Sequence, residues 1–330
     1  MQWPGNAVEC VTPKATPESA GVARAAGVGL GLWLHGLYLL VAVQTWAAPV
    51  LVVRGPRSDP YRDALAGFRQ AYSSATEIDQ GSTKEFDKRL RMDPPRMIVA
   101  IGRSAAEMVH QRAGSIPLFF LMVPDPAGLG LTGTNIAGVS MDVPAQVQLS
   151  RFKELLPDTK KPMAVIYNPA TSAAVITQAQ AAAPGLGIQL ELVPVESSEQ
   201  VRLRIGFVKP IIGSIWVVPD ESFVTGEREN KWFTYLLDEA KAMRMPFFIS
   251  MNAASGFVRE GALAAVVSDF SGIGRQAGEL VNEIQSGKLK FESVGVRPPL
   301  ALTWQIHRGT AQKIGLTIPP SVLQSATVFR

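Results

Sequence analysis

The sequence predicts an α/β protein with two doubly wound lobes, each built on a parallel sheet. Two observations favour this fold. Short apolar runs alternate with amphipathic helical segments from residue 49 onward, and the alternation restarts near residues 157–162. Such alternation is typical of parallel strands joined by right-handed crossovers. A TIM barrel is the alternative, but the strands are not spaced as eight even units.

The N-terminal segment has the organisation of a secretory signal. Lys14 and Arg24 precede an apolar run over residues 25–43, and small residues follow the run. A positive flank, an apolar core and small residues at the cleavage point make up such a signal. We therefore expect a signal peptide over residues 1–47, cleaved after Ala47, and a periplasmic mature chain. An uncleaved membrane anchor is the alternative, because the run approaches the length of a membrane span.

The first half of the mature chain opens with residues 50–53, a continuous apolar run that predicts a strand buried on both faces. In the helix expected next, Leu65, Phe68 and Tyr72 recur at the three- or four-residue spacing of one helical face. The same reasoning predicts strands at 97–101, 116–123 and 136–141, and helices at 60–73, 105–112 and 145–156.

The second half repeats the pattern. It predicts strands at 163–167, 189–193, 214–218, 246–249 and 263–267, and helices at 172–183, 199–208, 229–243 and 272–286.

Composition excludes several function classes. The net charge is +4, and no block of Lys and Arg of the kind that binds nucleic acid occurs. Cys10 precedes the expected cleavage point, so the mature chain would have neither a disulfide nor a thiol nucleophile. The mature histidines, His110 and His307, are far apart in sequence, and no metal-ligand spacing is present. We therefore expect no enzyme activity, no metal and no cofactor.

The segment 128–133 matches the dinucleotide motif G-x-G-x-x-G. That motif requires a helix to begin at the last glycine, so that the helix N-terminus meets the pyrophosphate. The residues that follow are strand-like instead. We interpret the segment as a loop.

Candidate ligand-binding residues are those that leave the strands or flank the crossings between the lobes, because ligands of open α/β sheets bind at the carboxyl ends of strands. They are Arg57, Ser58, Arg103, Ser104, Pro124, Asp125, Asn168, Ser172, Asp220, Asn252 and Asp269. An arginine could hold a ligand carboxylate bidentately.

Several of these residues also have a structural interpretation. Ser104 and Glu107 could form a capping box. Asn168 could cap a helix whose first residue is Pro169. Asp125 could be a turn residue.

Four groups of sequence motifs carry a family resemblance. They are Phe-Leu-Met-Val-Pro-Asp-Pro at 120–126 with Thr-Asn-Ile-Ala-Gly-Val-Ser at 134–140; Leu-Leu-Pro at 155–157 with Ile-Tyr-Asn-Pro at 166–169; Gly-Ala-Leu at 261–263 with Gly-Arg-Gln-Ala-Gly at 274–278; and Ala-Gln-Lys-Ile-Gly-Leu at 311–316. Together they span nearly all of the mature chain. In these motifs the sequence resembles the ABC-transporter substrate-binding proteins that include aromatic-amino-acid binding proteins.

The resemblance implies a periplasmic-binding-protein-like fold of the first structural class, with three segments crossing between the lobes. Lobe one would comprise residues 48–123 plus 252–295, and lobe two residues 124–251 plus 296–330. It also implies a monomer that captures a small organic ligand, an amino acid, in a cleft and delivers it to the membrane permease of an ABC importer. A periplasmic protein that signals to a membrane receptor is the alternative.

Overall fold

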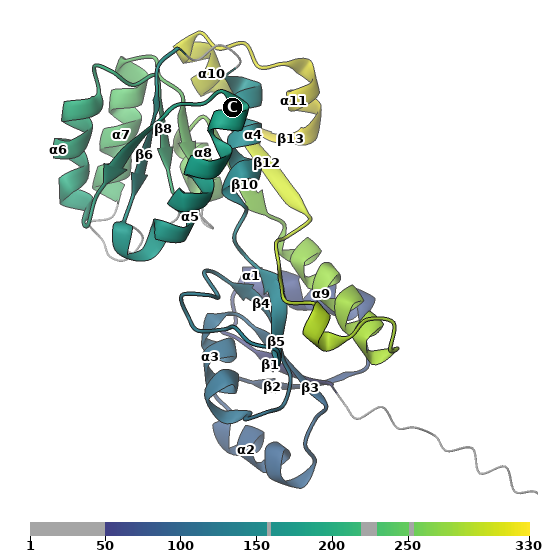
Figure 1. Ribbon diagram of the computed structural model, residues 1–330. Helices are drawn as coiled ribbons and strands as arrows, with labels where there is room; N and C mark the ends of the chain where they lie inside the picture. Colours follow the sequence, from purple (N-terminus) through teal and green to yellow (C-terminus); the bar gives the residue numbers. More distant parts are fainter. Residues whose placement is uncertain (1–49, 157–159, 219–229, 251–253) are drawn as a thin grey trace, which may run out of the picture. The chain divides into compact units, whose positions relative to one another are not determined.

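The computed structural model describes residues 50–156, 160–218, 230–250 and 254–330 (Figure 1). Residues Ala47–Arg330 form one compact unit, which contains two β-sheets. The expected signal peptide lies outside the described residues. None of the helices in these ranges contains an apolar stretch of the length that a membrane span requires.

The first sheet has six strands in the order β11-β5-β4-β3-β1-β2, and every neighbouring pair is parallel. Four of its strands, β1, β3, β4 and β5, are buried along their whole length or nearly so, as their mostly apolar runs predict. The strands are β1 (Val50–Arg54), β2 (Ala75–Asp79), β3 (Met97–Ile101), β4 (Leu118–Val123), β5 (Ile136–Ser140) and β11 (Val296–Arg297).

Helices cover both faces of the first sheet. One hydrophobic cluster joins the sheet to α1 (Asp59–Ala71) and α9 (Phe270–Gln285), and a second joins it to α2 (Thr83–Met92) and α3 (Arg103–Arg112). A short 3-10 helix, η3 (Phe291–Ser293), precedes β11.

Glycines let α1 and α9 approach each other closely. A Cβ atom added at Gly274 of α9 would lie 1.9 Å from the Ala64 carbonyl oxygen of α1. A Cβ at Gly67 of α1 would lie 2.0 Å from the Ser271 carbonyl oxygen of α9. No side chain fits at either position, so the two helix backbones are in direct contact.

The second sheet has seven strands in the order β13-β12-β10-β9-β8-β6-β7. All neighbours are parallel except β10 and β12. The strands are β6 (Met163–Tyr167), β7 (Leu190–Pro194), β8 (Ser214–Val217), β9 (Phe247–Ile249), β10 (Ala264–Ser268), β12 (Leu302–His307) and β13 (Ala326–Phe329).

The second sheet is also covered on both faces. One hydrophobic cluster includes residues of α6 (Ser198–Val208), α7 (Asn230–Ala242) and α8 (Ala254–Glu260). The other includes residues of α4 (Ala145–Leu155), α5 (Pro169–Ala182), α10 (Arg308–Ile314) and α11 (Pro320–Ser325), and the 3-10 helix η1 (Pro184–Leu186) follows α5. The expected fold class is confirmed: two mostly parallel sheets, each between layers of helices.

Strand pairing places three strands differently from the expected lobe boundaries. β5 and β11 were expected in lobe two but belong to the first sheet, where they pair with each other and β5 also pairs with β4. β10 was expected in lobe one but pairs with β9 and β12 in the second sheet. The chain therefore passes between the sheets at residues 141–144, at 269 and at 298–301. A buried apolar strand looks the same in either sheet, so composition does not assign it.

Candidate functional site

Strands β1, β3 and β4 end at one edge of the first sheet, because they are parallel neighbours. The chain leaves β1 and β3 through glycines. A Cβ at Gly55 would lie 2.5 Å from the Ile101 carbonyl oxygen, and one at Gly102, where φ is +93°, would lie 2.7 Å from the Tyr61 ring. These close approaches hold the loops after β1 and β3 against each other, and both loops carry expected ligand-binding residues.

The two expected arginines lie at these strand ends, each beside a carboxylate: Arg57 on the loop after β1 and Arg103 at the start of α3. The Arg57 side chain is 85% exposed and forms an ion pair of 3.4 Å with Asp79. The Nε of Arg103, the first residue of α3, donates to Glu107 Oε1 at 3.0 Å. Exposed ion pairs contribute little stability, so the Arg57 guanidinium can turn to an incoming carboxylate at small cost.

Neither of the expected serines, Ser58 and Ser104, caps a helix with its side chain as the capping motif indicated. Ser58 is the N-cap residue of α1, but its side chain makes no capping hydrogen bond. The expected capping box of Ser104 and Glu107 is wrong, because Gly102 is the N-cap residue of α3 and Glu107 binds Arg103 instead. Both serines are exposed at the edge of the sheet.

The loop after β4 is a tight turn built on Asp125. Pro124 is half-buried at its start, and Asp125 has a φ of +40°. Asp125 Oδ1 accepts a hydrogen bond of 3.1 Å from the Gly128 amide. Asp125 is therefore a turn residue. The glycine-rich segment 128–133 is a loop followed by strand β5 and not by a helix, as its sequence indicates.

Asp142, which the sequence interpretation overlooked, holds this turn in place. Its Oδ2 accepts hydrogen bonds from the Asp125 amide at 2.8 Å and from Ser140 Oγ at 3.0 Å. Burial raises the pKa of Asp142, while these two hydrogen bonds act in the opposite direction. Its position two residues after a buried strand was the available signal.

The expected residues of the second sheet cap and fill helix α5. Asn168 Oδ1 accepts a hydrogen bond of 3.0 Å from the Ala170 amide, and Pro169 is the first helical residue, so the expected cap is confirmed. Ser172, one turn later, is 1% exposed. Asn168 therefore lies at the carboxyl edge of β6, whereas Ser172 is inside the helix packing.

A buried chain of hydrogen bonds joins two strands of the second sheet to the first crossing segment. Trp216 Nε1 of β8 donates to Ser250 Oγ, after β9, at 2.8 Å. Ser250 Oγ donates to Gln148 Oε1 of α4, and Gln148 Nε2 donates to the Val143 carbonyl oxygen at 2.8 Å. Gln148 thus couples the crossing at 141–144 to the ends of β8 and β9.

The three crossing segments are hydrogen-bonded to one another. Ser268 Oγ donates to the Met141 carbonyl oxygen at 2.9 Å, and the Asp269 amide donates to the Ala301 carbonyl oxygen at 3.0 Å. Asp269 is the N-cap residue of α9, where its Oδ1 accepts from the Gly272 amide at 3.2 Å.

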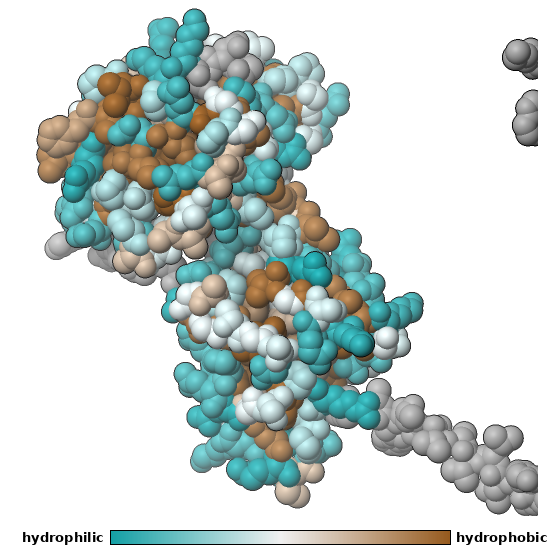
Figure 2. All heavy atoms as spheres, in the orientation of Figure 1, coloured by the Kyte–Doolittle hydropathy of each residue, from teal (hydrophilic) through white to brown (hydrophobic). Residues whose placement is uncertain are grey.

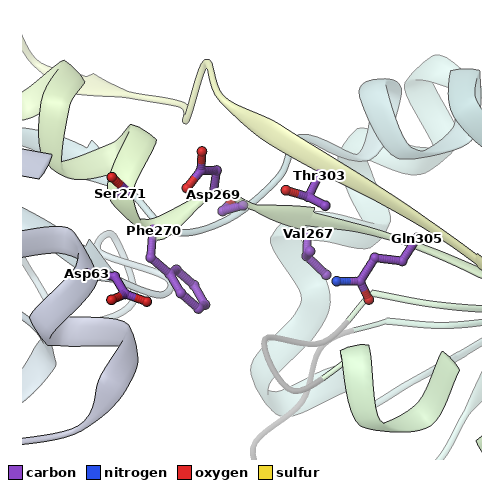
Figure 3. A pocket seen from close by; sticks show the side chains of 8 residues that line it. Asp63, Val267, Asp269, Phe270, Ser271, Thr303 and Gln305 are labelled. Carbon is purple, nitrogen blue, oxygen red and sulfur yellow. The ribbon is translucent and has the colours of Figure 1, made fainter. Parts of the chain in front are cut away.

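A pocket of about 210 Å³ lies beside the second and third crossings (Figure 3). Its lining is mostly polar and includes two carboxylates, and it consists of Asp63, Val267, Ser268, Asp269, Phe270, Ser271, Thr303 and Gln305. Asp63 and Phe270 come from α1 and α9, whereas Thr303 and Gln305 come from β12. Two carboxylates in one pocket favour a positively charged group such as an ammonium.

The structure thus groups some expected site residues and separates others. Arg57, Ser58, Arg103 and Ser104 share one sheet edge, while Asp269 lies in the pocket at the crossings. Asp220 and Asn252 lie outside the described residues. In the part of the chain that the structure describes, no group of three or more His, Cys, Asp or Glu residues is arranged to hold a metal ion.

Comparison with known proteins identifies the family. A family model described as "ABC transporter substrate binding protein" matches residues 68–329. The tyrosine-binding protein of Clostridioides difficile (strain R20291) is 26% identical over 232 residues, which are 68% of this chain; the match covers 63% of that protein, less than two thirds of its length.

Two solved structures share the fold. A domain from Streptococcus pneumonia in complex with L-Trp is 22% identical, with a TM-score of 0.56, and the match covers 85% of this chain and 100% of that one. The ligand-free, open structure of a substrate-binding protein with adhesive properties from Clostridium difficile is 18% identical, with a TM-score of 0.69 and coverage of 86% and 99%. With the family match over most of its length, the chain belongs to the ABC transporter substrate-binding proteins.

Proposed function

We propose that this protein is a periplasmic solute-binding protein that captures an amino acid between its two lobes and delivers it to the permease of an ABC importer. The family match over residues 68–329 is the observation that carries the proposal. The leader over residues 1–47 would direct export, and the mature protein would act as a non-enzymatic monomer.

An aromatic amino acid is the proposed ligand class. The names of two relatives support it, since one is a tyrosine-binding protein and another was solved with L-Trp. The charges also fit an amino acid, which carries one carboxylate and one ammonium group. Arg57 and Arg103 supply cations at the edge of the first sheet, and Asp63 and Asp269 supply anions in the pocket beside the crossings.

Calorimetric titration of residues 47–330 with the twenty L-amino acids tests this function. Binding of tyrosine, tryptophan or phenylalanine with a defined stoichiometry is the expected result. A ligand that binds only the folded state also raises the melting temperature in proportion to the logarithm of its concentration. If no amino acid produces binding heat or a thermal shift, this ligand class is ruled out.

Arg103→Ala is the most informative variant of the site, because the same helix also carries Arg112, whose substitution serves as a matched control. Arg103→Ala removes the guanidinium at the carboxyl edge of the sheet, while Arg112→Ala removes one at the opposite end of α3. The two side chains are 45% and 42% exposed, and each is paired with a carboxylate. A charge-assisted hydrogen bond contributes roughly 1.5–3 kcal/mol, so Arg103→Ala should weaken binding about ten- to hundredfold. Arg112→Ala should leave the affinity unchanged.

Equal affinities for the two variants would contradict the proposed role of Arg103 in holding the carboxylate. The proposal of amino-acid capture would then depend on the titration of the unaltered protein alone.

A further inference from the structure

Helix α6 is apolar on two faces, and only one of them is covered. Val201 and Ile205 are buried in the core of the second sheet. Leu203 and Phe207 lie on the opposite face, where they are 63% and 74% exposed. Ile211, on the turn after the helix, is 52% exposed. Surface helices ordinarily carry one apolar stripe, so the second stripe indicates an interaction.

Positive side chains flank this second face. Arg202 and Arg204 are exposed beside Leu203, and the exposed Lys161 reaches the turn, where its Nζ lies 3.5 Å from the Pro210 carbonyl oxygen. We define the α6 patch as Leu203, Phe207 and Ile211 with Arg202, Arg204 and Lys161. Figure 2 shows apolar surface over α6, at the left edge of the view.

Among the residues that the structure describes, acidic side chains near the α6 patch are fewer. Glu199 lies one turn before Leu203, and Glu239 of α7 is neutralised by Lys209 at 2.5 Å. The guanidinium of Arg202 lies 5.7 Å from the Tyr235 ring centre, which keeps this cation at the helix surface. The patch is therefore apolar in its middle and carries an excess of positive charge.

We propose that the α6 patch binds the surface of an anionic lipid bilayer. Apolar side chains flanked by Lys and Arg are the chemistry that inserts into the headgroup region and attracts anionic lipids. A second copy of this chain fits less well. Three partly exposed side chains offer on the order of a few hundred Å² of apolar surface, whereas a stable protein interface buries about 800 Å² per partner.

The shape of the groove along α6 favours a deformable partner such as a bilayer over a rigid protein surface. It is lined by Glu199, Arg202, Leu203, Gly206 and Phe207, all from this one helix, and has a volume of about 430 Å³. In the described part of the chain, no second wall from another element shapes it. A bilayer needs no complementary wall, because acyl chains and headgroups rearrange around inserted side chains. The proposed binding would hold the protein close to the membrane in which a permease resides.

Sedimentation of residues 47–330 with vesicles tests the proposal, since this segment is one compact unit that lacks the apolar leader. Vesicles of phosphatidylcholine containing phosphatidylglycerol are compared with vesicles of phosphatidylcholine alone. We expect binding to the anionic vesicles only, weakening as salt is added. No binding to the anionic vesicles at low salt would overturn the proposal.

Two variants assign the binding to the patch. Leu203→Gln combined with Phe207→Gln changes no charge and should lower partitioning at least tenfold. Met92→Gln combined with Leu300→Gln is the matched control, because these side chains are 76% and 79% exposed elsewhere on the chain. The control should bind as the unaltered protein does.

The charged half of the patch has its own test. Arg202→Gln combined with Arg204→Gln should lower partitioning about tenfold or more, because each cation near an anionic surface contributes about 1 kcal/mol. If either double variant, the apolar or the charged one, binds the anionic vesicles as well as the unaltered protein does, the proposal is overturned.

Sedimentation equilibrium in the absence of lipid tests the alternative that a second copy of this chain binds the α6 patch. A dimer that disappears in the Leu203→Gln, Phe207→Gln variant would assign the patch to a second copy and also overturn the proposal. Amino-acid binding measured on the same variants should be unaffected, so failure here is distinct from failure of the proposed ligand-binding function.

Discussion

Substitution of Gly274 by alanine should destabilise the protein, although alanine is the better helix former. An added Cβ would lie 1.9 Å from the Ala64 carbonyl oxygen and 2.8 Å from the Phe68 amide nitrogen. Ordinary contact begins at 3.4 Å, so α1 and α9 must separate by about 1.5 Å. Both obstructing groups are backbone, which no change of rotamer can move.

The magnitude follows from two opposing effects. Overpacking typically costs about 1–3 kcal/mol, and more where backbone must shift, while replacing glycine by alanine in a helix contributes about 1 kcal/mol in return. With the steric cost at or above the upper end, we expect a net loss of about 2 kcal/mol. At about 2–4 °C per kcal/mol, the melting temperature should fall by roughly 4–8 °C.

Thermal unfolding followed by circular dichroism measures the effect. Gly206→Ala in α6 is the matched control, because it is also a helical glycine, yet a Cβ there would meet nothing within 4 Å. It should raise the melting temperature by a few degrees. If Gly274→Ala melts at or above the temperature of the unaltered protein, the direct backbone contact between α1 and α9 is refuted.

Three further substitutions test the caps and the buried hydrogen bonds. Asn168→Ala should lower the unfolding free energy by about 1 kcal/mol in urea titrations, since it removes the cap of α5; no loss would show that the cap contributes nothing. Burial lowers the pKa of His307 below 6.5, so the unfolded chain binds a proton more readily and stability is lost as the pH falls through the lowered pKa. His307→Asn should therefore reduce the drop in melting temperature between about pH 7 and pH 5, and an unchanged drop would exclude His307 as its cause. Gln148→Leu deprives Ser250 of its acceptor and should cost about 1–3 kcal/mol, whereas Gln146→Leu, exposed on the same helix, should cost nothing measurable; equal unfolding midpoints would contradict the network.

The strands and helices that the sequence predicts agree with the structure within three residues at each end, because buried parallel strands and amphipathic helices have different periodicities. Helices α2, α8, α10 and α11 were not predicted. It does not predict β2, whose residues Thr76, Glu77 and Asp79 are polar. β2 is the edge strand of the first sheet, so it is less buried than the central strands and tolerates polar side chains. The C-terminal strands β12 and β13 were also missed: β13 has no buried residue, and β12 mixes buried with partly exposed residues and polar with apolar ones.

The candidate site was predictable only as positions on loops. Strand ends point to Arg57 and Arg103, because the carboxyl edge of a parallel sheet follows from chain order. Chain order does not predict which carboxylates pair with these two arginines. Glu107 binds Arg103 and not Ser104, because α3 begins two residues earlier than its apolar spacing indicates. Asp142 was overlooked since its partner Asp125 lies 17 residues away, beyond any local pattern.

The place of α9 in the chain has a consequence for how the protein is assembled during synthesis. α9 packs against α1, yet it is encoded after the strands of the second sheet up to β10. A ribosome that has completed β1 to β5 has therefore produced a first sheet with part of one face still bare. The apolar cluster on that side includes Met97 of β3 and Phe68 of α1, and it is completed only when residues 270–285 have emerged. A chain terminated after β10 would carry this apolar surface permanently, as a substrate for chaperones or for aggregation.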